Sequence, residues 1–218
     1  MGRAGGVTML PAAQKAMLAS LLLAVGLATI DQPYPELAPL QHIPTVLLTL
    51  AAPWLIRRWR LSTAAVGCLW LFLLLHTLGG RYIYSYVPYD DWARALTGGT
   101  ISGAFGWTRN HYDRLIHAAF GLLWTWPIQQ GLMQRHRVEA GFAFFLAFVT
   151  IGFGSAIYEI FEWLLTLMAA GDMADYYNGQ QGDPWDAQKD MALAQGGSAA
   201  AVLIAWGWRR AGRPASTV

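Results

Sequence analysis

The sequence predicts an all-α polytopic membrane protein with six transmembrane helices and both termini in the cytoplasm. Hydrophobic residues make up 55% of the 218 residues and charged residues only 13%, and the mean hydropathy is +0.32. These values are too apolar for a soluble domain of this size. The apolar residues form runs close to the ~20 residues that cross a bilayer, and basic residues gather between alternate runs. We therefore expect a single membrane domain over residues 1–218.

Six apolar segments are the candidate spans. They cover residues 14–30, 42–56, 62–78, 115–133, 140–168 and 191–208. The first segment has an alternative interpretation as a cleaved signal peptide, since Lys15 precedes a short apolar stretch that ends near small residues. Cleavage would leave five spans and move no other segment. The single cysteine, Cys68, lies in the third segment, so an intramolecular disulfide is excluded.

Charged residues set the expected orientation, because Lys and Arg favour cytoplasmic loops. With both termini inside, most of the 15 basic residues fall on the inner side. They are Arg3, Lys15, Arg57, Arg58, Arg60, Arg135, Arg137, Arg209, Arg210 and Arg213. Glu139 is the single acidic residue of 13 on that side. The outer side also has two longer loops, residues 79–113 and 169–189, which we expect to fold as a cap.

The segment QGDPWDAQKDM, residues 181–191, concentrates charge just before the sixth span. Asp183 followed by a proline is typical of a helix start, with Asp183 as the N-cap. Asp186 and Asp190 then lie on the same helix face as Asp183. A structural interpretation is open, because a carboxylate at a helix N-terminus is favourable by roughly 0.3–1 kcal/mol and Lys189 can pair with Asp186. The functional interpretation makes the three carboxylates one wall of a site.

The segment RNHYDRLIH, residues 109–117, lies at the outer start of the fourth span. Asp113 and His117 are spaced i, i+4 on a helix, and so are Asn110 and Arg114. A single histidine at a helix end is usually structural, but this segment combines two histidines with an aspartate and two arginines. Its candidate site residues are Arg109, Asn110, His111, Asp113, Arg114 and His117.

The segment SAIYEIFEW, residues 155–163, lies in the outer half of the fifth span. Glu159 and Glu162 share one helix face, and Tyr158 is four residues before Glu162. At 1.5 Å per residue, Glu159 lies roughly 30 Å along the helix from Glu139, near the outer edge of the hydrocarbon. Ionisable groups at that depth are costly unless they are paired or face water, so they are functional candidates.

A fourth segment, HTLGGRYIY, brings His76 to the outer end of the third span. All four segments lie at one depth, which predicts a polar pocket that opens to the outer side. We assign catalytic roles to Asp113, His117, Glu159 and Glu162. The assigned substrate-binding residues are Arg109, Asn110, Arg114 and Tyr158. The assigned metal ligands are His76, His111, Asp183, Asp186 and Asp190.

A divalent metal is one candidate cofactor of this pocket. Histidines with carboxylates suit Zn, Mn or Fe, and carboxylates alone suit Mg or Ca. The sequence has no HExxH or CxxC motif that would select a metal. In the metal-free alternative, Glu159 or Glu162 is a general base, while Arg109 and Arg114 hold a phosphate or carboxylate. The residues leave both alternatives open.

The four outer segments resemble the YjdF-like family of bacterial inner-membrane proteins. The resemblance rests on HTLGGRYIY, RNHYDRLIH, SAIYEIFEW and YYNGQQGDPWDAQKDM and covers nearly the whole chain. YDRLIH, YEIFEW and DAQKDMALAQGGSAAA are also similar, more distantly, to the VanZ-like superfamily. The resemblance implies a multi-pass protein of the bacterial cytoplasmic (inner) membrane and leaves its activity open.

Three functions are compatible with these residues. The first is an enzyme or a binding site at the outer face for a lipid-linked or cell-envelope substrate. The second, a transporter, is disfavoured because the inner halves of the last three spans offer few polar residues, namely Gln129, Gln130 and Gln195. The third is a structural network that tethers helix ends in a protein that assembles with a partner.

The expected partner of the apolar exterior is the lipid bilayer. Nucleic acid is not expected, since the basic residues follow the membrane topology and form no separate stripe. The small residues from Gly196 to Ala201 allow close helix packing within or between chains, so the oligomeric state is not predicted.

Overall fold

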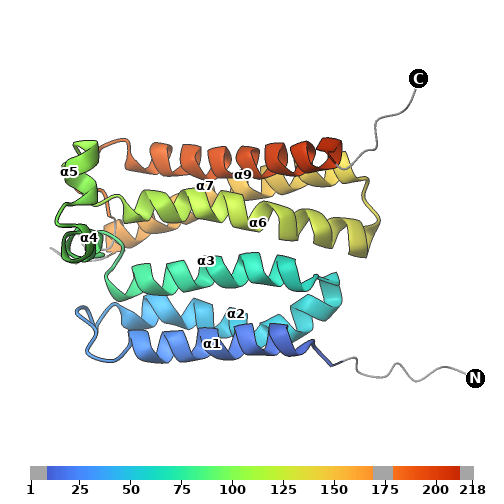
Figure 1. The fold of residues 1–218 in the computed structure, drawn as a ribbon, viewed down its shortest axis with the longest axis horizontal. Coiled ribbons are helices and arrows are strands. Elements are labelled where there is room, and N and C mark those ends of the chain that lie inside the picture. Colours follow the sequence, from blue (N-terminus) through green and yellow to red (C-terminus); the bar gives the residue numbers. More distant parts are fainter. Residues whose placement is uncertain (1–8, 169–178, 212–218) are drawn as a thin grey trace, which may run out of the picture.

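The computed structural model describes residues 9–168 and 179–211, and these residues form helices joined by loops, with no β-strand. The helices are α1 (Ala12–Ala28), α2 (Ala38–Trp59), α3 (Thr63–Arg81), α4 (Tyr89–Thr97), α5 (Ile101–Phe105), α6 (Tyr112–His136), α7 (Ala140–Met168) and α9 (Asp186–Ala211). The long helices run side by side, and the short helices α4 and α5 lie at one end of the bundle (Figure 1). The all-α prediction is confirmed.

Four of the described helices are long and apolar enough to cross a membrane by length and composition: α2, α3, α7 and α9. Helix α1 is apolar but shorter. The start of α1 and the end of α9 lie at the same end of the bundle (Figure 1), as an even number of antiparallel crossings requires. The six-span count and the cytoplasmic termini stay predictions. Arg3, Arg213 and much of the predicted loop 169–189 lie outside the described residues.

Helix α2 is longer than the apolar run 42–56 that predicted it. It begins at Ala38 with a proline in its first turn and continues through Pro44 and Pro53. Proline is compatible with a first turn, because the N–H that it lacks has no partner there. Gln41 and His42 are buried in the bundle, so these polar residues belong to the helix although they lower its hydropathy.

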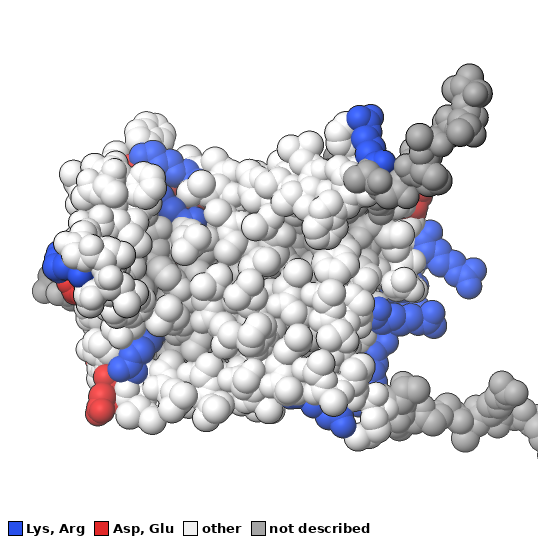
Figure 2. Space-filling model, in the orientation of Figure 1, with Lys and Arg blue, Asp and Glu red and all other residues white. Residues whose placement is uncertain are grey.

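Charged side chains lie at the two ends of the bundle. Lys and Arg side chains are visible at both ends, and the visible surface between the ends is free of charge (Figure 2). Arg57, Arg58 and Arg135 lie at the end opposite α4 and α5, in the last turns of α2 and α6. Basic residues at a helix C-terminus also interact favourably with the helix dipole. The uncharged band is the expected surface for contact with lipid.

Glycines bring α6 and α9 into close contact. A Cβ atom added at Gly121 would collide with the backbone of Ala194, and one added at Gly197 would collide with the backbone of Ala118. Small residues allow such an approach between helices in membranes. The pair therefore packs within one chain, and its register fixes which side chains of α6 meet which side chains of α9 at the end of the bundle near α4 and α5. We call this the outer end, because the sequence predicts that it faces outward.

The outer end of α6 also packs on α3 and on the segment that follows it. Tyr84, Val87 and Tyr112 belong to a buried apolar cluster there. The Tyr112 hydroxyl donates to the Leu75 carbonyl oxygen over 2.9 Å. These contacts hold the first turn of α6 between α3 and α9, where most of the candidate site residues lie.

Candidate functional site

Two groups of charged residues meet at the outer ends of α6 and α9. The arginine cluster consists of Arg109, Arg114, Asp183, Asp186 and Lys189. The acidic cluster consists of Asp113, His117, Glu159 and Asp190. Residues of α6, α7, α9 and the loops before α6 and α9 contribute to them. The stripe of three aspartates predicted near α9 is therefore divided between two clusters.

The arginine cluster is closely paired. Arg109 Nη1 donates to Asp186 Oδ1 over 2.6 Å, and Arg114 Nη2 donates to Asp183 Oδ2 over 2.5 Å. Lys189 Nζ donates to the same Asp183 oxygen over 2.6 Å. Asp186 is only 4% exposed, so its charge depends on these partners. The cluster joins two carboxylates to three cations.

Arg109 also fixes the loop before α9. Its guanidinium donates to the carbonyl oxygens of Gly179 over 3.1 Å and Gln180 over 3.0 Å. Asn110 contributes from its backbone, whose N–H donates to Gln181 Oε1 over 2.9 Å. These bonds join segments that are far apart in the sequence. The predicted substrate-binding residues Arg109 and Asn110 are thus engaged by the protein itself.

Asp183 organises the start of α9. Its Oδ1 accepts a hydrogen bond from the Trp185 backbone N–H over 3.1 Å, as a helix cap does. Helix α9 begins at Asp186, two residues after the start predicted from the sequence. Helix ends vary by one or two residues with the criterion used. Hydrogen bonds from Lys189, from the Trp185 backbone and from Arg114 hold the pKa of Asp183 well below its usual range.

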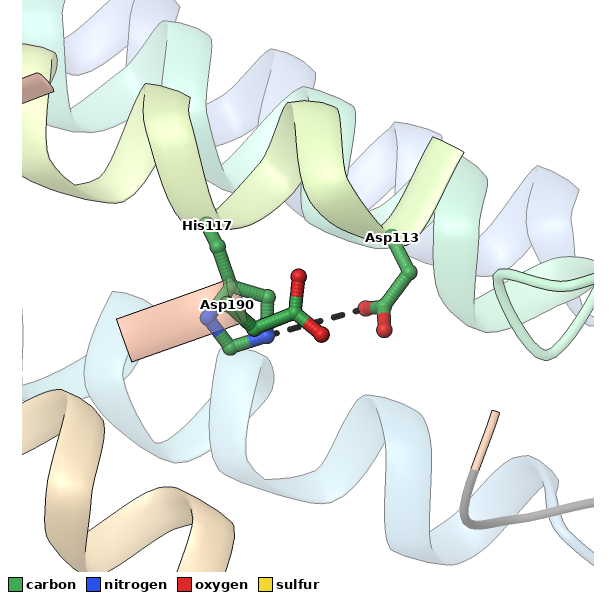
Figure 3. A group of neighbouring side chains, drawn as sticks. All are labelled: Asp113, His117 and Asp190. Atoms are coloured by element: carbon green, nitrogen blue, oxygen red, sulfur yellow. Dashed lines mark ion pairs between the residues drawn. The ribbon is translucent and has the colours of Figure 1, made fainter. Parts of the chain in front are cut away.

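The acidic cluster has no such cations. His117 Nε2 lies 3.8 Å from Asp113 Oδ1 and 3.5 Å from Glu159 Oε1. One ligand atom each of Asp113, His117 and Asp190 lies within 4.8 Å of the others. Figure 3 shows both carboxylates beside the imidazole, with Asp190 reaching across from α9. No Lys or Arg within the described ranges forms an ion pair with these residues.

Burial makes the acidic cluster unusual. Asp113, His117 and Asp190 are 8%, 6% and 2% exposed. Asp190 Oδ1 and Glu159 Oε1 are buried and have no hydrogen-bond partner among the described residues. Buried carboxylates of this kind are costly unless a positive partner or a proton compensates them. The cluster therefore needs something that the side chains around it do not supply.

Tyr158 and Glu162 lie on α7 beside the acidic cluster. The Tyr158 ring centroid is 5.9 Å from that of His117, at an interplanar angle of 62°, and the Tyr158 side chain hydrogen-bonds Glu162. Glu162 is buried at 8% exposure. The two glutamates of the predicted site thus differ, because Glu159 faces His117 and Glu162 is held by Tyr158.

A cavity of ≈ 260 Å³ opens beside the acidic cluster. Asp113, His117 and Tyr158 line its outer part, and apolar residues of α2, α3 and α6 line most of the rest. Thr45 and Ser155 also line it, and their hydroxyl oxygens are buried without a hydrogen-bond partner in the described part of the chain. The cavity is therefore mainly apolar, with a few polar groups near one end.

The other two predicted histidines are engaged elsewhere. His76 Nδ1 lies 2.5 Å from the Tyr84 hydroxyl oxygen and borders the cavity. The His111 ring stacks on Trp107 with the centroids 4.3 Å apart. Burial, together with the positive charges of Arg114 and Arg109, lowers the pKa of His111. The structure thus brings Asp113, His117, Glu159 and Asp190 together and leaves these two histidines outside that group.

Sequence reasoning missed three polar residues of the interior. His42 is 4% exposed, and neither ring nitrogen has a hydrogen-bond partner among the described residues. Thr45 and Trp124 line the cavity. A histidine at the edge of an apolar run was a signal that could have identified His42. Thr45 and Trp124 have no such signal, since threonine and tryptophan are common in membrane helices.

A bundle with an uncharged band and a buried acidic cluster at its outer end defines an integral membrane protein with a candidate cation site. The chain belongs to the family described as "Predicted membrane protein (DUF2238)", whose model matches residues 13–211. It is similar to "Inner membrane protein YjdF" of Escherichia coli (strain K12), with 31% identity over 171 residues, which cover 78% of this chain and 75% of that relative. No solved structure matches the chain.

These comparisons confirm the predicted family and the location in the bacterial inner membrane. The distant resemblance to VanZ-like proteins is not shown by them and stays a prediction. The roles assigned to the site residues likewise stay predictions, because neither the family description nor the name of the relative states an activity.

Proposed function

We propose that this protein is a metal-dependent hydrolase that acts on a lipid-linked substrate at the outer face of the bacterial inner membrane. The observation that carries the proposal is the buried group Asp113, His117 and Asp190, whose ligand atoms lie within 4.8 Å of one another. A divalent cation bound there would compensate buried carboxylates that form no ion pair with a Lys or Arg of the described residues.

The spacing within the acidic cluster supports a shared ion. Ligand atoms about 2.0–2.2 Å from one cation lie roughly 3–4 Å from one another. The separation of 3.8 Å between His117 Nε2 and Asp113 Oδ1 falls in that range and is too long for a good hydrogen bond, and a ligand atom of Asp190 lies within 4.8 Å of both residues. The unpartnered oxygens of Glu159 and Asp190 are an independent support. One imidazole with carboxylates suits Zn, Mn or Fe.

The residues around the cluster have complementary roles in hydrolysis. Asp113, His117 and Asp190 would hold the cation, which would supply Lewis-acid activation of a water. Glu159, whose Oε1 lies 3.5 Å from His117 Nε2, would accept a proton from the attacking water. The water oxygen would bond to the substrate phosphorus or carbonyl carbon as the bond to the leaving oxygen breaks, and Glu159 would return the proton to the leaving oxygen.

The arginine cluster has a structural role in this proposal. Its cations are already paired with Asp183 and Asp186 and with loop carbonyls, so they are not free to clamp a substrate. By fixing the start of α9 against the start of α6, the cluster places Asp190 beside His117. For the residues of the arginine cluster we therefore propose the structural role considered from the sequence, in which a network of ion pairs tethers helix ends.

Metal content tests the proposal. Detergent-purified protein, stripped with chelator and dialysed against Zn²⁺ or Mn²⁺, is expected to bind about one ion per chain. Asp190→Asn and His117→Gln should lose that ion, because each removes one buried ligand. Asp91→Asn is the matched control, since Asp91 lies on α4 with its side chain 71% exposed. Elemental analysis by mass spectrometry measures the bound metal.

Hydrolysis is then tested with a bacterial lipid extract. Metal-loaded wild-type protein should release new lipid products detectable by mass spectrometry, and Glu159→Gln should bind the metal but release none. A folded wild-type protein that takes up no metal, or an Asp190→Asn variant that binds as much as wild type, would refute the metal site. Metal binding without any lipid product would refute the hydrolase.

A further inference from the structure

We infer that the cavity beside the acidic cluster binds a diacyl glycerolipid, with ester carbonyls at Thr45 and Ser155 and one acyl chain in the apolar part. This inference rests on the proposed function only in placing the lipid head group at the acidic cluster. It names diacyl glycerolipids as the substrate class of the proposed hydrolase. Lipid binding itself can be measured in the absence of metal.

The depth of the cavity matches one bilayer leaflet. On α6 the cavity is lined from Asp113 to Trp124, a separation of eleven residues and about 16 Å at 1.5 Å per residue. Half of a hydrocarbon core of about 30 Å is close to this depth. An acyl chain of an outer-leaflet lipid therefore fits along the cavity while its head group stays at the outer end.

The polar atoms of the wall select an ester-linked lipid. Thr45 and Ser155 are 2% and 1% exposed, and their hydroxyl oxygens have no hydrogen-bond partner in the described part of the chain. Ser155 lies four residues inward of Glu159, about 6 Å along α7. Ester carbonyls just below a lipid head group accept hydrogen bonds from hydroxyls at this level, and hydrocarbon alone does not.

We place the entry path between α2 and α7. Both helices line the cavity, through Thr45 on α2 and Ser155 on α7, yet no Cα atom of α2 lies within 8 Å of one of α7 among the described residues. Because these two helices do not pack closely, this is the side by which the inferred lipid would enter from the bilayer.

A second apolar cavity of ≈ 480 Å³ continues inward and shares Leu48, Leu73 and Trp124 with the first. The second cavity gives a chain longer than one leaflet room to extend. A carrier lipid with one long isoprenoid chain is therefore the competing occupant. The two occupants differ in their ester carbonyls, which only the glycerolipid has.

Competition between two lipids tests the inference. Delipidated protein in detergent with chelator is mixed with equal amounts of dioleoyl phosphatidylglycerol and its diether analogue, and retained lipid is counted by native mass spectrometry. Wild type should retain the diester form roughly 2- to 10-fold more, the fold-change expected for one or two hydrogen bonds of ordinary strength. Thr45→Val and Ser155→Ala should each bring the ratio closer to one.

A cavity-filling variant gives the second arm. Gly154 lines the cavity, and a Cβ atom added there contacts Phe120 at 3.4 Å, so Gly154→Leu should retain several-fold less lipid of either kind. Gly196→Leu is the matched control, because Gly196 also lies in a long helix and has nothing within 4 Å of an added Cβ. That control should retain as much lipid as wild type.

The outcomes separate the two proposals. Equal retention of diester and diether lipid by wild type, or preferential retention of an isoprenoid lipid offered in the same mixture, would overturn the inference. Unchanged retention in Gly154→Leu would also overturn it. Selective retention of the diester by a protein that binds no metal would support the lipid site and refute the proposed metal-dependent hydrolase activity.

Discussion

The arginine cluster and the acidic cluster lie side by side at the outer ends of α6 and α9, but they balance their charge differently. In the first, Asp183 and Asp186 meet three cations at 2.5–3.7 Å. In the second, Asp113, Glu159 and Asp190 lie beside the His117 imidazole, and no Lys or Arg of the described residues forms an ion pair with them. A paired carboxylate stabilises the fold, whereas a buried carboxylate without a Lys or Arg partner costs stability, and this difference is why we propose a cation at the acidic cluster. Aspartates on one helix face can thus have opposite roles.

Loss of an arginine should have the largest effect on stability. Arg109→Ala leaves the buried Asp186 carboxylate without its 2.6 Å partner, and breaking a buried pair in this way costs about 3–5 kcal/mol. The free energy of unfolding in mixed detergent micelles measures this cost. Arg94→Ala is the control, since the Arg94–Asp91 pair has side chains 59% and 71% exposed and such pairs contribute at most about 1 kcal/mol. Equal free energies of unfolding for Arg109→Ala and Arg94→Ala would contradict the greater importance of the buried ion pair over the exposed one.

Added metal should stabilise through the acidic cluster alone. At one hundred times the dissociation constant, a divalent cation raises the free energy of unfolding by about 2.7 kcal/mol. Wild type and Arg94→Ala should show this rise, and His117→Gln should not. In the absence of metal, Asp190→Asn should be at least as stable as wild type, because it removes a buried charge. A large loss in metal-free Asp190→Asn would mean that this carboxylate is already paired.

A change at the α6–α9 contact should damage both clusters together. Gly121→Ala places a methyl group against the Ala194 backbone, and overpacking of this kind costs about 1–3 kcal/mol. The variant should also bind metal more weakly, since Asp190 moves away from His117. Gly196→Ala, which has open space around it, should keep both properties. Normal metal binding in a destabilised Gly121→Ala would show that the acidic cluster does not depend on this contact.

The smallest expected effect is a pH dependence that belongs to Asp183. Its pKa in the folded protein is lowered, chiefly by the hydrogen bond from Lys189, whereas the pKa of an aspartate in an unfolded chain is about 3.9. A lowered folded pKa stabilises the protein above the unfolded pKa, and this stabilisation is lost as the pH falls below about 4. The stability difference between wild type and Asp183→Asn should be constant above about pH 5 and shrink below pH 4. A difference that grows in acid would contradict this sign.

Local sequence patterns predicted the helices and the depth of the site. Hydropathy found the long helices, and the spacing of Asp113 with His117 and of Glu159 with Glu162 placed these residues at one membrane face. Their cross-helix partners could not be predicted, because those depend on the register that Gly121 and Gly197 set between α6 and α9. Helices α4 and α5 were expected only as part of a cap, since their sequence has no long apolar run.

The identity of the atoms that bind the metal tests the central claim most directly. X-ray absorption at the zinc edge of tag-free, Zn²⁺-loaded protein should show one imidazole nitrogen and carboxylate oxygens at about 2.0–2.2 Å. The nitrogen contribution should disappear in His117→Gln, and the oxygen contribution should change in Asp190→Asn. A spectrum that is the same in wild type and both variants would place the metal elsewhere and contradict the cation site at Asp113, His117 and Asp190.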